Sequence, residues 1–201
     1  MSTREGAYTD RLRRPDSARW KRLLDVQRPY RWNVRRLSPG FVLDVGCGIG
    51  RNLAHLGGHG VGIDHNPHSV AEARARGLEP YTNEEFTGTR WNRERTFDSL
   101  LCSHVLEHMR MDEARQLPID YLPLLRSHGR VIIIVPQTAG FRSDPTHVQC
   151  LGPPQLAELI RPLPLDFELS GSFPFPAWAG RVFRHNETVA LYRSRGDPAL
   201  R

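Results

Sequence analysis

The sequence has few of the features that mark secreted or membrane proteins. Its three cysteines, Cys47, Cys102 and Cys150, are odd in number and form no C-x-x-C pair, which favours a reducing, cytoplasmic location. No window approaches the roughly 18 consecutive apolar residues of a membrane span, and charged residues stand at the N-terminus in place of an apolar segment. We therefore expect neither a membrane span nor a signal peptide.

Lysine is almost absent, and the basic residues are unevenly distributed. Only one of the 28 basic residues is a lysine, Lys21, which suggests a general bias toward arginine and weakens an interpretation of the basic residues as phosphate ligands. Residues 1–40 contain eleven basic and four acidic side chains, a net charge of +7 where the whole chain carries +6. We expect three parts: a basic, partly helical N-terminal arm or lid (1–37), one α/β domain (38–195) and a tail (196–201).

The basic arm has two interpretations. Ser17 can cap a helix from about residue 18 to residue 36, interrupted near Pro29. Aromatic side chains at helical spacing, among them Trp20 and Trp32, favour a helix that packs on the sheet edge and covers a ligand site. Binding of nucleic acid or of an acidic substrate is the alternative.

The third glycine of the dinucleotide-binding fingerprint G-x-G-x-x-G is also missing. Counted from Gly46, that glycine belongs at position 51, where Arg51 stands. The apolar run that begins at Val42 leads instead into D-x-G-x-G-x-G, which starts at Asp44 and ends at Gly50. Glycines at alternate positions remove side chains where the backbone turns and meets a ligand, so we expect a strand, a cofactor-binding loop and then a helix.

A second acidic residue supports a nucleotide-type cofactor. Residues 61–64 are typical of the next parallel strand, with Asp64 at its carboxyl end, twenty residues after Asp44. A carboxylate at this place can accept hydrogen bonds from both hydroxyls of a ribose.

These motifs together resemble a known family. The pattern from Asp44 is similar to motif I of the class I S-adenosylmethionine (SAM) dependent methyltransferases. Residues 97–108, FDSLLCSHVLEH, resemble the fourth strand of that family and the start of its next helix, and residues 129–136 resemble its fifth strand. The match extends over residues 38–195. It implies an α/β, Rossmann-like doubly wound sheet of seven strands, mostly parallel with an antiparallel C-terminal hairpin strand, and helices on both faces.

Prolines and alternating residues divide the C-terminal half. A helical segment runs from Asp112 toward Ser127, but two prolines within it cannot donate backbone hydrogen bonds, so we expect a kink or two short helices. After the strand at 129–136 we expect a loop to about Gly152 and then a helix with two prolines in its first turn. The hairpin is expected from two late alternating segments, at 167–172 and 187–193.

The resemblance implies SAM as cofactor and S-adenosylhomocysteine as product. It assigns Asp44 to the methionine end, Asp64 to the ribose, and His65 with Glu84 or Glu85 to the adenine. For Glu84 and Glu85 the alternative is the start of a surface helix. The complete set implied for the cofactor is Asp44, Gly46, Cys47, Gly48, Gly50, Asp64, His65, Glu85, Ser103 and His104.

Four residues are candidates for work on the acceptor. His104 follows the fourth strand and is either a general base or a structural histidine at a strand end. Asp144 and His147, with Arg142, lie in the polar segment FRSDPTHV, and "DPTH" resembles a phrase found at this place in some small-molecule methyltransferases. The alternative for this segment is an Asx-Pro turn that only shapes the loop.

A metal site is considered and not expected. His104 and His108 are four residues apart with Glu107 between them, a spacing that can place two imidazoles on one face of a helix. A Glu-His pair, however, is common at this place in methyltransferases without metals.

The most favoured function is therefore a SAM-dependent methyltransferase that acts on oxygen or nitrogen of a small-molecule acceptor. One alternative is an RNA (tRNA or rRNA) methyltransferase that uses the basic arm, and the other is a non-catalytic SAM-binding protein. We expect no membrane partner, and a monomer or homodimer.

Overall fold

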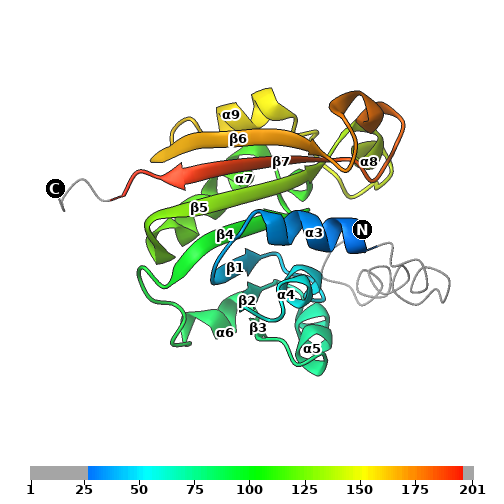
Figure 1. Cartoon of the computed structure of the whole chain (residues 1–201). Coiled ribbons are helices and arrows are strands. Elements are labelled where there is room, and N and C mark those ends of the chain that lie inside the picture. Colours follow the sequence, from blue (N-terminus) through cyan, green and yellow to red (C-terminus); the bar gives the residue numbers. More distant parts are fainter. Residues whose placement is uncertain (1–26, 197–201) are drawn as a thin grey trace.

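Seven strands form one sheet in the order β3-β2-β1-β4-β5-β7-β6 (Figure 1) in the computed structural model, which describes residues 27–196. The strands are β1 (Val42–Val45), β2 (Gly60–Ile63), β3 (Pro80–Tyr81), β4 (Phe97–Ser103), β5 (Leu125–Pro136), β6 (Leu165–Phe173) and β7 (Glu187–Ser194). The pairs from β3 to β5 are parallel, and β7 is antiparallel to both β5 and β6. The predicted Rossmann-like sheet with an antiparallel hairpin is confirmed.

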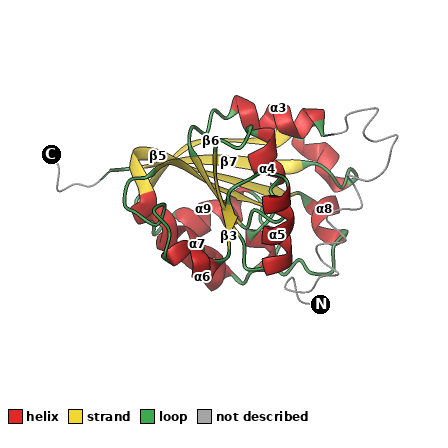
Figure 2. Cartoon of the chain, turned by 90° about the horizontal axis from the view of Figure 1, so that it is seen from below, coloured by secondary structure: helices red, strands yellow, loops and turns green. Residues whose placement is uncertain are grey.

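Helices cover both faces of this sheet, as Figure 2 shows. The α-helices are α3 (Arg28–Arg36), α4 (Arg51–His55), α5 (Pro67–Ala75), α6 (Asn83–Thr87), α7 (Met111–Tyr121), α8 (Thr138–Arg142) and α9 (Pro153–Ile160). Three 3-10 turns, η1 (Leu106–His108), η2 (Leu122–Leu124) and η3 (Ala177–Arg181), complete the elements in residues 27–196. None of the described helices combines the length and the apolar character needed to cross a membrane.

The apolar side chains of β5 alternate between two buried clusters. Val131, Ile133 and Val135 pack in the cluster under α6, α7 and α9, and Ile132 and Ile134 pack in the cluster under α3 and α4. A parallel strand buried on both faces needs such a continuous apolar run. The sheet is therefore held between two helical layers, and its strand ends are free to carry loops.

Helix α3 is the described part of the predicted arm. It begins at Arg28, with Pro29 in its first turn, where a missing N–H has no effect on the helix. Val34 and Leu37 are buried in the cluster under α3 and α4, so this segment packs into the domain. The predicted helical residues 18–26 lie outside the described residues.

Two expectations for the C-terminal half need correction. The helical segment from residue 112 is two helices, as its prolines predicted: α7 ends at Tyr121 and η2 follows it. It stops short of residue 127, because Leu125 already pairs with Phe97 in the sheet. The predicted loop before Gly152 contains the short helix α8, whose Phe141 N–H bonds to the carbonyl of Gln137. The predicted helix with two prolines in its first turn is confirmed as α9.

Candidate functional site

The glycine loop between β1 and α4 turns through left-handed backbone conformations. Gly46, Gly48 and Gly50 have φ angles of 76°, 52° and 76°, which favour glycine. The Gly46 N–H donates to the Ile63 carbonyl at 2.8 Å, so the loop is joined to the end of β2. A Cβ on Gly46 would lie 2.3 Å from Cγ2 of Val105, which means that the loop also packs against the turn after β4.

Asp64 holds the same loop from the end of β2. Its Oδ2 accepts a hydrogen bond from the Gly48 N–H at 2.7 Å, and its Oδ1 accepts one from the Asn66 N–H at 2.8 Å. Each carboxylate oxygen has a second lone pair, so these bonds leave acceptor capacity for a ligand.

Asp44 is a buried carboxylate at this edge of the sheet, without hydrogen-bond partners among the described residues. The residue is 1% exposed, and neither carboxylate oxygen has a hydrogen-bond partner among residues 27–196. Burial raises the pKa of Asp44 to about 7; Asn52, which lies close without completing a hydrogen bond, lowers the pKa, and the charge of Asp64 raises it. An unpaired buried carboxylate is costly, so this position can accept a donor from outside the described residues.

Cys47 and Glu85 have structural partners. A Cβ on Gly62 would lie 2.6 Å from the Cys47 sulfur, so this thiol fills the space beside β2, and burial raises its pKa well above the usual range. Glu85 lies 2.6 Å from an Arg74 nitrogen and completes a capping box with Thr82. The surroundings of Glu85 thus match the surface-helix alternative.

His65 and Ser103 lie near the glycine loop, after β2 and at the end of β4. His65 follows Asp64, with its Nδ1 3.7 Å from Asp64 Oδ1, and its side chain is 38% exposed. Ser103 is the last residue of β4 and is half-buried. Both remain predicted cofactor contacts.

His104 lies between two carboxylates. Its Nε2 is 2.8 Å from Oε1 of Glu187, and its Nδ1 is 3.2 Å from Oε1 of Glu107. Burial lowers the pKa of His104, but the interactions with Glu107 and Glu187 outweigh it and raise the pKa to about 10. The ring is protonated at neutral pH and has no free nitrogen to accept a proton. This geometry favours the structural interpretation of His104 over the general base.

In the predicted acceptor loop, Asp144 shapes a turn and His147 packs against His108. Asp144 Oδ1 accepts hydrogen bonds from the N–H and the hydroxyl of Thr146, at 2.9 and 2.7 Å, which is the turn-shaping alternative. Arg142 is exposed. His147 lies against His108, with ring centroids 4.8 Å apart. One ligand atom each from Glu107, His108 and His147 lies within 4.8 Å of the others, so these three residues could hold a metal ion.

Sequence reasoning missed Glu187. It is 83 positions from His104 and lies at the start of β7, a strand that returns beside β5 in the opposite direction. No local pattern marks it, and only the position of the hairpin in the sheet could have indicated it.

Comparisons with known proteins agree with the fold. Residues 43–131 match the family model of a methyltransferase domain. A chain from the complex between the Haloferax volcanii Trm112 methyltransferase activator and the putative methyltransferase has a TM-score of 0.72 at 15% identity, over 98% of this chain and 99% of that chain. Magnesium protoporphyrin IX methyltransferase from Synechocystis PCC 6803 with bound S-adenosylhomocysteine has a TM-score of 0.66 at 17% identity, over 96% of each chain.

A SAM-dependent methyltransferase from Archaeoglobus fulgidus has a TM-score of 0.63 at 16% identity, over 86% of this chain and 99% of that chain. No curated protein sequence matches the chain. At these identities the solved structures show the fold alone. The segment that matches the family model, residues 43–131, runs from β1 into β5. Residues 43–131 are therefore similar to a methyltransferase domain, and residues 27–196 have the fold of the class I, SAM-dependent methyltransferases.

Proposed function

We propose that this chain is a SAM-dependent methyltransferase that transfers a methyl group to oxygen or nitrogen of a small-molecule acceptor. The observation that carries the proposal is Asp44, a buried carboxylate without a hydrogen-bond partner among the described residues, beside a left-handed glycine loop. The methionine end of SAM has an ammonium group, which provides the missing donor directly or through water. Asp64 is the proposed partner of the ribose hydroxyls.

The chain's own contribution to the reaction is to position the reactants. SAM supplies an activated methyl group when bound, so the protein has to hold donor and acceptor in line. Asp64 fixes the glycine loop through Gly48, and Gly46 packs on Val105, so the loop and the turn after β4 form one rigid edge. An acceptor bound over this edge lies at the carboxyl ends of the parallel strands, where open α/β sheets bind ligands.

The arginines of α3 favour a small acceptor over RNA. Arg35 Nε donates to the carbonyl of His55 at 2.6 Å. The guanidinium of Arg36 lies 4.9 Å from the ring centroid of Trp32 and donates to Asn33. Arg35 thus joins α3 to α4, and the Arg36 guanidinium, which also lies 5.6 Å from the ring centroid of Phe173, joins α3 to β6. RNA binding by the arm is an outcome of the tests below.

Calorimetric titration of the full chain with SAM and with S-adenosylhomocysteine tests cofactor binding. Saturable uptake of one equivalent of either compound is expected, and absence of uptake of both overturns the proposal.

Transfer of a radioactive methyl group from SAM, assayed in parallel on a small-molecule extract and on RNA, then separates the three functions. Label in the small-molecule fraction supports the proposal. Label in RNA that is lost at high salt supports the RNA alternative. Cofactor uptake without any labelled product favours a non-catalytic SAM-binding protein.

A further inference from the structure

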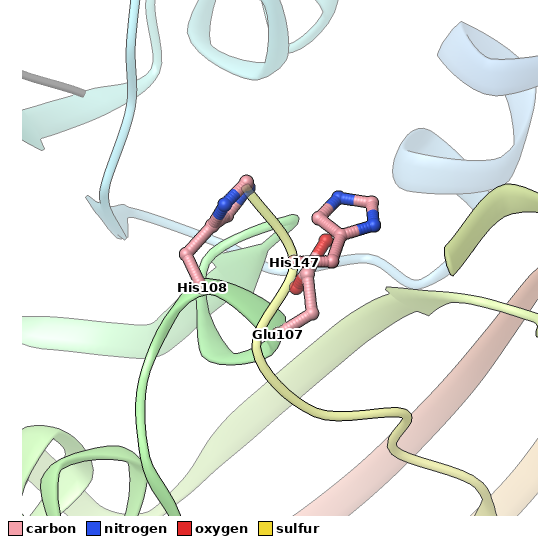
Figure 3. Close-up of side chains that lie close together, drawn as sticks. All are labelled: Glu107, His108 and His147. Carbon is pink, nitrogen blue, oxygen red and sulfur yellow. The ribbon is translucent and has the colours of Figure 1, made fainter. Parts of the chain in front are cut away.

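Two histidines and a glutamate come together beside the proposed cofactor loop. Glu107 and His108 belong to the turn η1 after β4, and His147 comes from the loop between α8 and α9 (Figure 3). One ligand atom from each side chain lies within 4.8 Å of the other two. The backbone joins these segments as well, because the Val148 N–H donates to the Glu107 carbonyl at 2.7 Å.

Each of the two imidazole rings has a backbone carbonyl beside its Nδ1. Nδ1 of His108 lies 3.2 Å from the carbonyl oxygen of Thr146 and 3.1 Å from its hydroxyl oxygen, whose own hydrogen is donated to Asp144 Oδ1. Nδ1 of His147 lies 2.8 Å from the carbonyl oxygen of Phe141. An Nδ1–H that donates to a carbonyl leaves the lone pair on Nε2, which is the tautomer that a metal ion binds. Backbone carbonyls on the far nitrogen are the usual outer partners of metal-binding histidines.

Glu107 is a buried acidic residue whose carboxylate oxygens lack hydrogen-bond donors among the described residues. The residue is 1% exposed, and neither carboxylate oxygen has a hydrogen-bond partner among residues 27–196. Its nearest cation is His104, whose Nδ1 lies 3.2 Å from Oε1 without hydrogen-bond geometry. A buried carboxylate beside two imidazoles forms a ligand set for a cation.

We propose that Glu107, His108 and His147 bind one divalent transition-metal ion, with Zn²⁺ as the first candidate. Two imidazoles and one carboxylate are the protein ligands of one class of catalytic zinc sites, which keep a further position open. The ligand atoms of a tetrahedral zinc site are roughly 3.4 Å apart, so small side-chain movements bring this set into range. The proposal departs from the expectation of no metal, since the sequence placed His104 in the ligand set and gave no sign that His147 joins it.

The position of the site suggests its use. Val105, two residues before Glu107, is the side chain that packs against Gly46 of the glycine loop. A metal ion here would lie on the acceptor side of the sheet edge, where its open position can bind and polarise an acceptor oxygen. This last role rests on the proposed methyltransferase function; metal binding itself does not.

The test is titration of the metal-stripped full chain with ZnCl₂ alone, followed by dialysis and elemental analysis. One equivalent of retained zinc is expected. His108→Ala and His147→Ala should each weaken the affinity at least about tenfold, while the exposed His68→Ala control binds as the wild type does. Failure of the wild type to retain zinc, or retention by the double His108→Ala/His147→Ala variant, overturns the proposal.

Two further measurements keep the outcome clear. Circular dichroism reports whether each variant is folded. If a variant fails to fold, the wild type still gives an answer, because Co²⁺ substituted for Zn²⁺ reports histidine coordination by its visible absorption. A Co²⁺ spectrum without imidazole coordination counts against the site. SAM titration of the same variants should be unchanged, which separates failure of the metal site from failure of the cofactor site.

Discussion

Asp64 Oδ2 accepts a hydrogen bond of 2.7 Å from the Gly48 N–H, and this contact joins the loop after β1 to the end of β2. The chain itself therefore holds the loop in place. A loop that is already in place loses little conformational freedom when a ligand binds, which favours affinity.

Asp64→Ala should weaken SAM binding by about tenfold or more, because it removes charge-assisted acceptors for the ribose as well as the contact with Gly48. Calorimetry measures the change. Asp112→Ala is the matched control, since the Asp112 side chain is 76% exposed and lies on the first turn of α7. Equal affinities for the two variants would show that Asp64 takes no part in the cofactor site.

Asp44→Asn should stabilise the ligand-free protein in a pH-dependent way. Burial raises the folded-state pKa of Asp44 to about 7, so the folded protein keeps a proton that the unfolded chain loses near pH 4. Stability contributed at this site therefore falls as the pH rises from about 4 to about 7, and the full penalty remains above that range. The substitution should gain roughly 1–3 kcal/mol of unfolding free energy at pH 8 and close to none at pH 4, measured by urea unfolding.

The same substitution should weaken SAM binding, because the ammonium of the ligand loses its ionic partner. A variant that is more stable at pH 8 and binds SAM as tightly as the wild type would contradict the assigned role of Asp44.

Gly46→Ala should destabilise the domain more than Gly57→Ala. Both glycines have left-handed backbone, with φ of 76° and 70°, so both variants lose about 1 kcal/mol from backbone strain. Only at Gly46 would the new Cβ meet a neighbour, Val105 Cγ2 at 2.3 Å, whereas nothing lies within 4 Å at Gly57. Overpacking adds about 1–3 kcal/mol at Gly46. Thermal unfolding measures both variants, and equal losses would rule out the close packing of the loop on Val105.

His104→Asn should lower stability by about 1–2 kcal/mol, a figure reduced for the 44% exposure of the His104 side chain. It leaves Glu107 and Glu187 as neighbouring carboxylates without the cation between them. Asparagine tolerates the left-handed backbone at this position, where φ is 58°, so strain does not confuse the result.

The double variant His104→Asn/Glu187→Gln should recover part of the loss, because it removes one of the two carboxylates. Denaturant unfolding of the single and double variants completes the cycle. A double variant less stable than His104→Asn alone would show that Glu187 has a separate structural role.

The strands and the glycine loop could be predicted from the sequence because their signals are local. A fully buried strand such as β1 needs a short apolar run, and the turn after it needs glycine where φ is positive, so Val42–Gly50 identifies itself. The helix with Pro153 and Pro154 in its first turn is local in the same sense.

The side-chain partners could not be predicted, because they come from segments distant in the chain. His104 meets Glu187 through the return of β7 beside β5, and Glu107 meets His147 through a loop whose path depends on α8. Whether Asp144 faces a ligand or caps its own turn was also open, since an Asx-Pro sequence permits both.

The uncompensated carboxylate of Asp44 has a consequence for the protein in a living cell. If the proposed cofactor pairs with Asp44, a molecule without it keeps this charge penalty and is expected to open more often to proteases. Occupied molecules would survive longer than empty ones. Abundance of the protein would then follow the supply of its ligand.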